Sequence, residues 1–288
     1  MTSVELRLEL LRRTQNEDGG WGYFAGRESS VEATAYTLRA IGAGDSGWDR
    51  GIAFLLARQE KDGGLAPRAT VPGSTWVTAL AFPLLKKAAV ASKALVRAAD
   101  WILNTEGAEG GLTERFLFSI GKAKVEQDPR LKGWPWRPGN NSWVEPTAHG
   151  LIALWSMDGC APEAGVRYRR DVATKMLIDR RCADGGWNYG NRKVLGEVLP
   201  GYPETTALAL LGLAGSSVDL SASLDAAARD FAATKGAYGR ALLSLALGAH
   251  GRPAIYSPLT EQPHPSANLM LSAIEVLAAR GAGRGLLA

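Results

Sequence analysis

A short motif recurs along the chain, and each copy follows an apolar helical pattern. Residues 15–21 read QNEDGGW, and residues 181–187 read RCADGGW. Weaker copies end in leucine at residues 59–65, QEKDGGL, and at residues 109–112, EGGL. A repeated unit cannot bury its apolar face alone, so neighbouring units must stack on one another. The repeat therefore constrains the architecture before any single residue is considered.

Each copy leads across a loop into a second helix start that contains a threonine. These starts read VEATA at residues 31–35, WVTA at 76–79, VEPTA at 144–148 and ETTA at 204–207. Threonine hydroxyls near a helix start can satisfy free backbone amides. The glycines of the motif allow the positive φ values at which many helices end. The motif and its loop therefore predict a helix stop followed by a helix start.

The helices before and after each Gly-Gly pair differ in character. The first class carries apolar residues at helical spacing and many charges, and is expected at about residues 4–15, 48–60, 94–105 and 166–181. The second class is apolar or small on nearly every face, and is expected at residues 33–41, 77–85, 148–154 and 207–213. A helix that is apolar all round is buried on both sides. We therefore expect an inner ring of apolar helices inside an outer ring of charged helices.

Three later helical patterns, at residues 220–234, 237–249 and 266–279, complete about five to six hairpins. Strand patterns are nearly absent. The sequence predicts an all-α fold, an α/α toroid with inner and outer helix rings, as a single domain over residues 1–288. Residues 113–141 interrupt the repeat period and are expected to form an insertion loop. This loop could cap a cavity, touch a membrane or simply pack against the domain.

Composition excludes several classes of function. The net charge is +4, but the basic residues are scattered and no nucleic-acid-binding motif is present, which argues against nucleic acid as a partner. Cys160 and Cys182 are expected to be buried free thiols. The cysteines and histidines lack close metal-ligand spacing, so we expect no metal and no cofactor.

No apolar run approaches the ~18 residues of a membrane span. Residues 1–13 read as an amphipathic helix with both acidic and basic side chains, which is unlike a signal peptide. We therefore expect a cytoplasmic protein, and peripheral contact with a membrane stays open.

The motif resembles the Gln-x-x-x-Gly-x-Trp repeat of the squalene–hopene cyclase and prenyltransferase superfamily. Gln15, Gly19 and Trp21 match it fully; the copy at 181–187 has arginine for glutamine, and the copy at 59–65 has leucine for tryptophan. The resemblance covers most of residues 1–215. It implies an α/α toroid with a central cavity. It also implies a class II terpene cyclase-like function, an isomerase-type reaction in which protonation starts cyclisation of a linear isoprenoid.

The resemblance also indicates a candidate acid. Class II terpene cyclases carry Asp-x-Asp-Asp-Thr-Ala at an inner-helix start, and the middle aspartate donates the proton. Thr147 and Ala148 align with Thr-Ala, which places Glu145 at the acid, although the chain has no Asp-x-Asp-Asp. His149 lies four residues later on the same helical face, where a charged imidazole could raise the acidity of Glu145. Glu32 and Glu204 hold the same repeat position, so a structural carboxylate at the helix start is the alternative role.

Aromatic residues near the inner-helix starts and in the insertion complete the predicted site. Their faces could stabilise a carbocation or line an apolar pocket, and packing between repeats is the alternative. The predicted substrate-binding residues are Glu32, Trp76, Trp136, Trp143, Tyr202 and Glu204. Two functions follow: a cyclase-like enzyme acting on an apolar isoprenoid, or a barrel without catalysis that binds an isoprenoid, a lipid or a protein. A single barrel could need a homodimer or a second barrel chain to close its pocket.

Overall fold

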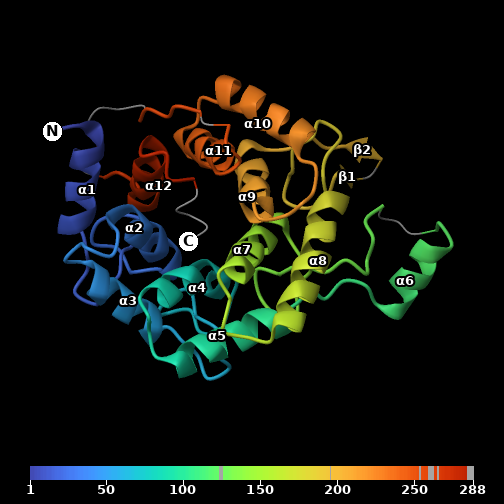
Figure 1. Cartoon of the computed structure of the whole chain (residues 1–288), viewed down its shortest axis with the longest axis horizontal. Coiled ribbons are helices and arrows are strands. Elements are labelled where there is room, and N and C mark those ends of the chain that lie inside the picture. Colours follow the sequence, from blue (N-terminus) through green and yellow to red (C-terminus); the bar gives the residue numbers. More distant parts are fainter. Residues whose placement is uncertain (123–125, 195, 253, 259–262, 265, 284–288) are drawn as a thin grey trace.

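The structure is a computed structural model, and it describes residues 1–122, 126–194, 196–252, 254–258, 263–264 and 266–283 (Figure 1). Within these ranges the chain is almost entirely helical. The strands found there are β1 (Lys193–Val194) and β2 (Glu197–Val198), which pair as a two-residue antiparallel ladder. The prediction of an all-α fold is confirmed.

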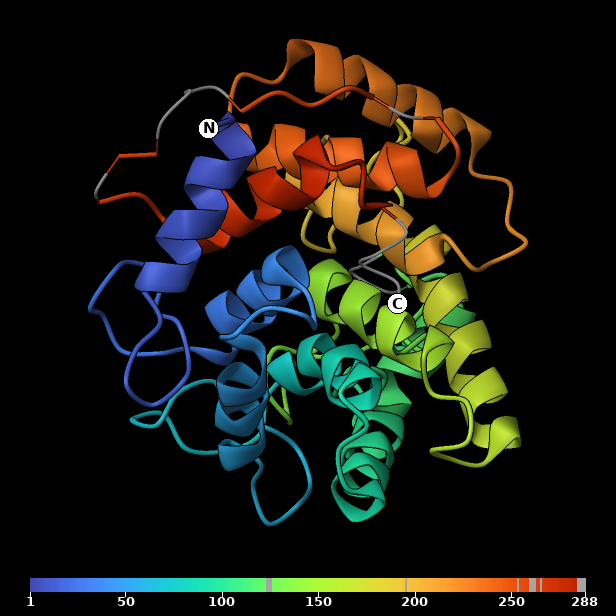
Figure 2. The ribbon, with the colours of Figure 1, turned by 60° about the vertical axis from the view of Figure 1, so that its left-hand side comes forward.

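Six helices of the described chain form a closed inner ring. They are α2 (Val31–Ile41), α4 (Val77–Lys87), α7 (Val144–Trp155), α9 (Pro203–Leu213), α11 (Ala237–Ala249) and α12 (Leu269–Ala279). Each packs against the next in this order, and α12 packs back against α2, so the ring closes (Figure 2). Most of their residues are buried, as expected for helices that are apolar on every side.

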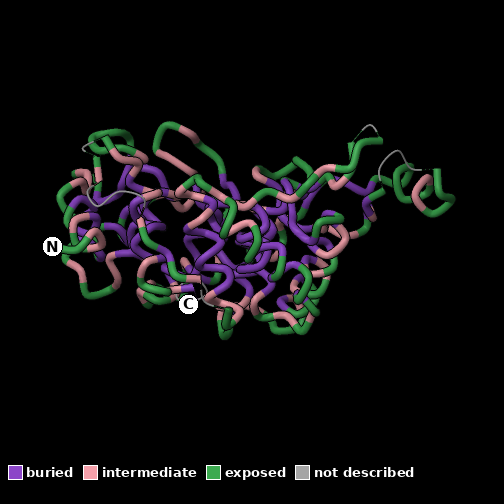
Figure 3. Tube along the Cα trace, turned by 90° about the horizontal axis from the view of Figure 1, so that it is seen from above, coloured by how far each residue is buried: buried purple, intermediate pink, exposed green. Residues whose placement is uncertain are grey.

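The more polar helices lie outside this ring. They are α1 (Ser3–Arg13), α3 (Trp48–Ala57), α5 (Ser92–Asn104), α8 (Glu163–Asp179) and α10 (Ser221–Ala233). Helix α1 packs against α12 and α2, α3 against α2 and α4, α5 against α4 and α8, α8 also against α7, and α10 against α9 and α11. The predicted α/α toroid with two helix rings is therefore confirmed. Buried residues run through the middle of the molecule, between the exposed loops (Figure 3).

Helix α6 (Leu112–Ser119) stands apart from both rings (Figures 1 and 3). All of it except Leu112 lies within the predicted insertion, and none of its residues is buried. The side chain of Glu114 accepts a hydrogen bond from the backbone N–H of Gly110 at 2.8 Å, which supports the start of the helix. None of the helices in the described part of the chain combines the length and apolar character needed to cross a bilayer.

A threonine on each of four inner helices holds the loop that precedes it. The Thr34 hydroxyl accepts a hydrogen bond from the backbone N–H of Trp21 at 2.8 Å. The same bond joins Leu65 to Thr78 at 2.7 Å, Trp134 to Thr147 at 3.0 Å and Trp187 to Thr206 at 2.9 Å. The threonine hydroxyls thus satisfy amides of the preceding loop.

The tryptophan of the motif also binds the outer helix before it. The indole N–H of Trp21 donates to the Leu11 carbonyl at 2.7 Å, and that of Trp134 donates to the Ile102 carbonyl at 2.8 Å. Trp134 therefore ends a repeat, although it lies within the predicted insertion 113–141. The assignment of Leu112 to this position is wrong, because Leu112 begins α6 and is 88 % exposed.

The first glycine of the motif is required by the backbone. Gly19 has φ +86° and Gly63 has φ +97°, in the left-handed region. A Cβ on either would lie 2.4 Å from the carbonyl oxygen of Arg50 or Arg97 on the next outer helix. The turn can therefore approach the neighbouring helix only without a side chain.

The two ends of the described chain meet at a buried ion pair. Arg7 Nε of α1 lies 2.8 Å from Glu275 Oε2 of α12, and both residues are buried. The hydroxyl of Tyr256 donates a hydrogen bond to Glu275 Oε1 at 2.8 Å. This network fixes α1 over the point where the inner ring closes.

Replacing Thr34 by valine keeps the volume of the side chain and removes the acceptor for the Trp21 N–H. A buried donor without a partner costs about 1–3 kcal/mol. We expect Thr34→Val to lower the free energy of unfolding by this amount in a urea titration. Thr113→Val, at an exposed position of α6, is the matched control and should change little. An equal stability for both variants would contradict the role given to Thr34.

Removing one member of the buried ion pair leaves the other charge without its carboxylate or guanidinium partner. We expect Glu275→Leu to lower the free energy of unfolding by about 3–5 kcal/mol. The double variant Arg7→Met/Glu275→Leu should recover most of this loss, since neither charge is then buried. Chemical unfolding of the wild type, of Glu275→Leu, of Arg7→Met and of the double variant measures the coupling free energy between the two side chains. A double variant no more stable than Glu275→Leu would show that the pair does not close the ring.

Candidate functional site

Three glutamates gather at one end of the toroid. Glu32, Glu145 and Glu204 each lie in the first turn of an inner helix, α2, α7 and α9. Because the inner helices form a ring, equal positions in the repeat face a common axis. The N-terminal end of α11 lies beside these glutamates, because a Cβ added to Gly239 would be 3.0 Å from Glu204 Oε1. We refer to Glu32, Glu145 and Glu204 as the glutamate cluster.

The surroundings of Glu145 raise the pKa of its carboxyl. Burial is the main cause, and the negative charges of Glu32 and Glu204 add to it; together they raise the pKa of Glu145 to about 8. The Glu145 carboxyl is therefore mostly protonated at neutral pH. Its oxygens make no hydrogen bond to another described residue, so the proton is free to be donated.

Glu32 is held more firmly than Glu145. The Tyr23 hydroxyl donates a hydrogen bond to Glu32 Oε2, and the guanidinium of Arg68 lies 5.4 Å from the centre of the Tyr23 ring. Burial raises the pKa of Glu32, while the bond from Tyr23 and the charge of Arg68 oppose that rise. Neighbours that favour the charged form make Glu32 the better candidate for a carboxylate beside protonated Glu145.

His149 lies deeper on the axis than Glu145. Burial lowers the pKa of His149 to about 3, and the positive charge of Arg39 adds to this shift. An imidazolium that would strengthen Glu145 as an acid is therefore disfavoured. In the described structure no hydrogen bond joins the two side chains, and the His149 Nε2 atom is buried without a partner.

The centre of the toroid is nearly filled. The side chains that surround its internal cavity are Tyr36, Arg39, Leu80, His149, Ile152, Leu208, Leu211 and Leu242. The cavity volume is about 10 Å³, which is roughly what one water molecule needs. Arg39 donates to the Leu80 carbonyl at 2.9 Å, and among the described residues it has no carboxylate partner. Burial lowers its pKa to about 10, so the guanidinium remains charged at neutral pH.

The predicted aromatic residues divide into two places. Trp76 lies against Trp136 with ring centres 5.0 Å apart, edge to face, and against His149 at 5.2 Å. These side chains lie beside the axis. Trp143 instead lines a separate cavity, and exposed Tyr202 packs against Tyr189 with ring centres 5.5 Å apart.

Four residues near the glutamate cluster were not predicted from the sequence: Tyr23, Tyr36, Arg39 and Tyr238. Burial and the charges of Glu145 and Glu32 raise the pKa of Tyr36. The same glutamates, with Glu204, help to raise the pKa of Tyr238 at the start of α11. Tyr36 could have been found from its place four residues after Glu32 on one helical face.

The site holds groups that can donate and accept protons. It combines a neutral carboxyl, a second carboxylate and several tyrosine hydroxyls at the edge of an apolar helix ring. In the described ranges, no three histidine, cysteine, aspartate or glutamate side chains are grouped closely enough to hold a metal ion. Pairs of carboxyls with separated pKa values are the usual basis of acid–base chemistry.

Because the pKa of Glu145 is raised in the folded state, we expect the stability of the protein to depend on pH. The folded state keeps this proton up to about pH 8, whereas the unfolded chain loses it near pH 4.5, so the folded state binds more protons between these values. Stability contributed by the protonated carboxyl is present below pH 4.5 and is lost as the pH rises to 8. Glu145→Gln should therefore gain stability relative to the wild type across this window, by at most about 1.4 kcal/mol per pH unit.

Urea unfolding at a series of pH values measures this difference. Glu17→Gln removes an exposed carboxyl far from the axis and is the matched control. A difference between Glu145→Gln and the wild type that stays constant from pH 4.5 to 8 would contradict the assigned ionisation of Glu145.

Comparisons with known proteins support the fold. No protein-family model matches the chain. A drimenyl diphosphate synthase from Streptomyces showdoensis is 38 % identical over 71 residues, which cover 23 % of this chain and only 13 % of that protein. The type II terpene cyclase MstE from Scytonema superposes with a TM-score of 0.59 at 14 % identity, over 98 % of this chain and 97 % of that chain.

Two glycoside-acting proteins are equally similar in structure. The α-1,6-mannanase GH76A of Salegentibacter sp. HEL1_6 has a TM-score of 0.61 at 11 % identity, covering 98 % of each chain. The endoglucanase Cel10 from Klebsiella pneumoniae has a TM-score of 0.58 at 11 % identity, covering 96 % of this chain and 99 % of that chain. At such identities the likeness shows the fold alone. The chain has a terpene cyclase-like α/α toroid fold, and the squalene–hopene cyclase repeat in particular is not shown.

Proposed function

We propose that this chain is a terpene cyclase-like enzyme in which Glu145 donates the proton that starts cyclisation of a linear isoprenoid. The observation that carries the proposal is the burial of Glu145 beside Glu32 and Glu204, which raises the pKa of Glu145 to about 8 and keeps it protonated at neutral pH. Glu32, with Tyr23 and Arg68 beside it, is the carboxylate suited to receive a proton at the end of the reaction.

The strength of the acid limits the substrate. A carboxyl with a pKa of about 8 is a weaker proton donor than an ordinary carboxyl, and an unactivated alkene is a very weak base. An oxygen atom is a better acceptor for this proton. We therefore infer an isoprenoid with an epoxide: the Glu145 O–H bond breaks, the epoxide oxygen takes the proton, its C–O bond opens and a neighbouring double bond attacks the freed carbon. Loss of a proton from the final cation completes an isomerisation.

The substrate would lie at the mouth of the toroid. The axial cavity of about 10 Å³ cannot hold an isoprenoid, whereas partly exposed Trp136, which packs edge to face on buried Trp76 before α4, offers an aromatic surface. The structural similarity to MstE supports this class of ligand, because a variant of that type II terpene cyclase was captured with geranylgeranyl dihydroxybenzoate as its substrate. A second copy of the chain, or another barrel chain, would cover the hydrocarbon from the open side.

A non-catalytic isoprenoid-binding protein is the second candidate. The filled axis and the buried charge of Arg39 favour it, because a guanidinium repels a carbocation formed nearby. This candidate predicts that an isoprenoid binds at the mouth and is released unchanged.

Purified protein should be incubated with squalene, its terminal epoxide and polyprenols, and products identified by mass spectrometry. We expect a cyclised product from the epoxide, with turnover falling about 10²–10⁴-fold in Glu145→Gln, the usual range for loss of a general acid. Glu17→Gln should turn over like the wild type. Full turnover by Glu145→Gln would refute the acid, and binding of the epoxide without product would favour the second candidate.

A further inference from the structure

A cavity of about 240 Å³ lies outside the glutamate cluster. Its lining residues come from the described parts of the connection between α5 and α7 and from the loop that follows α8. Glu109 and Gln127 line it from the first segment, Arg180 and Asn191 from the second, and Trp143 lies between them at the start of α7. None of the cluster glutamates contributes to its wall.

Two buried polar side chains in this wall have atoms without hydrogen-bond partners. Glu109 Oε2 accepts a hydrogen bond from the Ser142 N–H at 3.0 Å, but Glu109 Oε1 accepts none among the described residues. Arg180 Nη1 donates to the Gly190 carbonyl at 3.1 Å, while Arg180 Nε has no acceptor within hydrogen-bond distance there. Glu109 is 9 % exposed and Arg180 is 6 % exposed, so bulk water satisfies neither.

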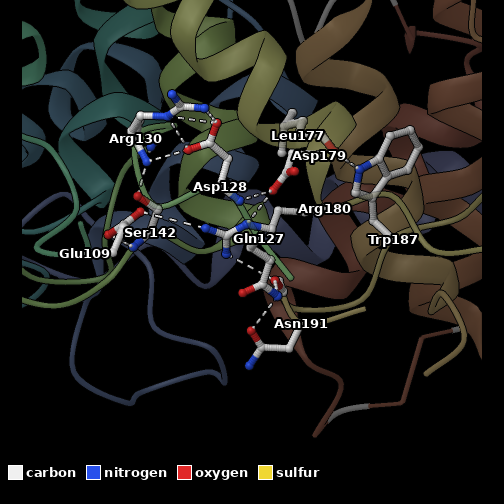
Figure 4. Close-up of polar contacts among 12 residues, drawn as sticks. Glu109, Gln127, Asp128, Arg130, Ser142, Leu177, Asp179, Arg180, Trp187 and Asn191 are labelled. Carbon is white, nitrogen blue, oxygen red and sulfur yellow. Dashed lines mark hydrogen bonds and ion pairs between the residues drawn. The ribbon is translucent and has the colours of Figure 1, made fainter. Parts of the chain in front are cut away.

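The two side chains form a long ion pair, and Arg180 Nε also lies 3.6 Å from Asp179 Oδ2. Arg180 Nη2 lies 4.0 Å from Glu109 Oε1, which is too long for a hydrogen bond (Figure 4). A single group that both donates and accepts could serve the pair: it would donate to the carboxylate and accept from the guanidinium. A hydroxyl group has this property, whereas a phosphate oxygen or an ammonium has only half of it.

The charge of the wall also selects against ions. Glu109 and Glu114 line the cavity with Arg180, so an anion would meet a buried carboxylate and a cation would meet a buried guanidinium. The remaining polar wall is neutral. Gln127 donates to the Gly190 carbonyl and to Asn191 Oδ1, both at 2.9 Å, which fixes the amide groups at the rim. Trp143 also lines the cavity, and aromatic residues are common in the walls of ligand sites.

We propose that this cavity binds a neutral polyhydroxylated molecule of the size of a monosaccharide, with one hydroxyl between Glu109 and Arg180. The volume of about 240 Å³ exceeds what one or two waters require. The site is independent of the proton donor Glu145, so it stands or falls separately from the proposed function.

Ligand-observed NMR with D-glucose, D-mannose and myo-inositol at millimolar concentration tests the site. We expect saturation transfer to at least one of them, and an affinity about tenfold weaker or more in Glu109→Gln, which removes the charged acceptor. Asn141→Trp adds bulk at an exposed position of the wall and should abolish binding with the fold intact, which guards against misfolding of the buried variant. Glu17→Gln should bind like the wild type.

The same titration with inorganic diphosphate separates the alternatives. Competition of diphosphate with the sugars, with tighter diphosphate binding in Glu109→Gln, would identify an anion site and overturn the proposal. Absence of saturation transfer from all three polyols would show that the cavity holds water alone, which would also overturn it.

Discussion

One hydrogen bond organises the toroid, the bond from a loop backbone N–H to the hydroxyl of an inner-helix threonine. Thr34, Thr78, Thr147 and Thr206 each accept it, and it sets the position of an inner helix relative to the preceding loop. Where the loop residue is tryptophan, its indole N–H also binds the end of the outer helix. At Trp21, Trp134 and Trp187, loop, outer helix and inner helix are thus tied at one residue, and α2, α7 and α9 are presented in the same way.

This regularity has an electrostatic consequence. In a linear array, a residue that recurs with the repeat is spread along a surface, but in a closed ring it returns to the same axis. Glu32, Glu145 and Glu204 therefore share one partly buried space, where burial and the charges of the other two glutamates raise the pKa of Glu145. The recurrence favoured a structural role when the sequence was considered alone. In the folded ring, the same recurrence produces a carboxyl that is protonated at neutral pH, so repeat position does not separate scaffold from chemistry.

Much of the fold could be predicted because the inner and outer helices differ in polarity. The helix at residues 237–249, for example, has the predicted bounds. The prediction failed at Leu112, because the chain between α5 and Trp134 separates Gly110 from the tryptophan that ends the repeat. The position of Glu145 could be found from the repeat. The contacts of Tyr238 and Arg39 could not be predicted from the sequence. They depend on how each helix is rotated about its axis and on closure of the ring between residues distant in sequence. The Glu109–Arg180 cavity was missed for the same reason.

The fold alone does not decide what the toroid does, since cyclase and glycoside-acting proteins share it at similar TM-scores. The distribution of charge along the axis is more informative. The interior holds the guanidinium of Arg39, and the mouth holds the carboxyls of the glutamate cluster with the faces of Trp76 and Trp136 beside them. A positive charge that develops during a reaction is therefore opposed in the interior and stabilised at the mouth, by carboxylate charge and by aromatic quadrupoles. Under the proposed function, we therefore infer that the chemistry takes place at the mouth, where the ligand is covered from outside the ring.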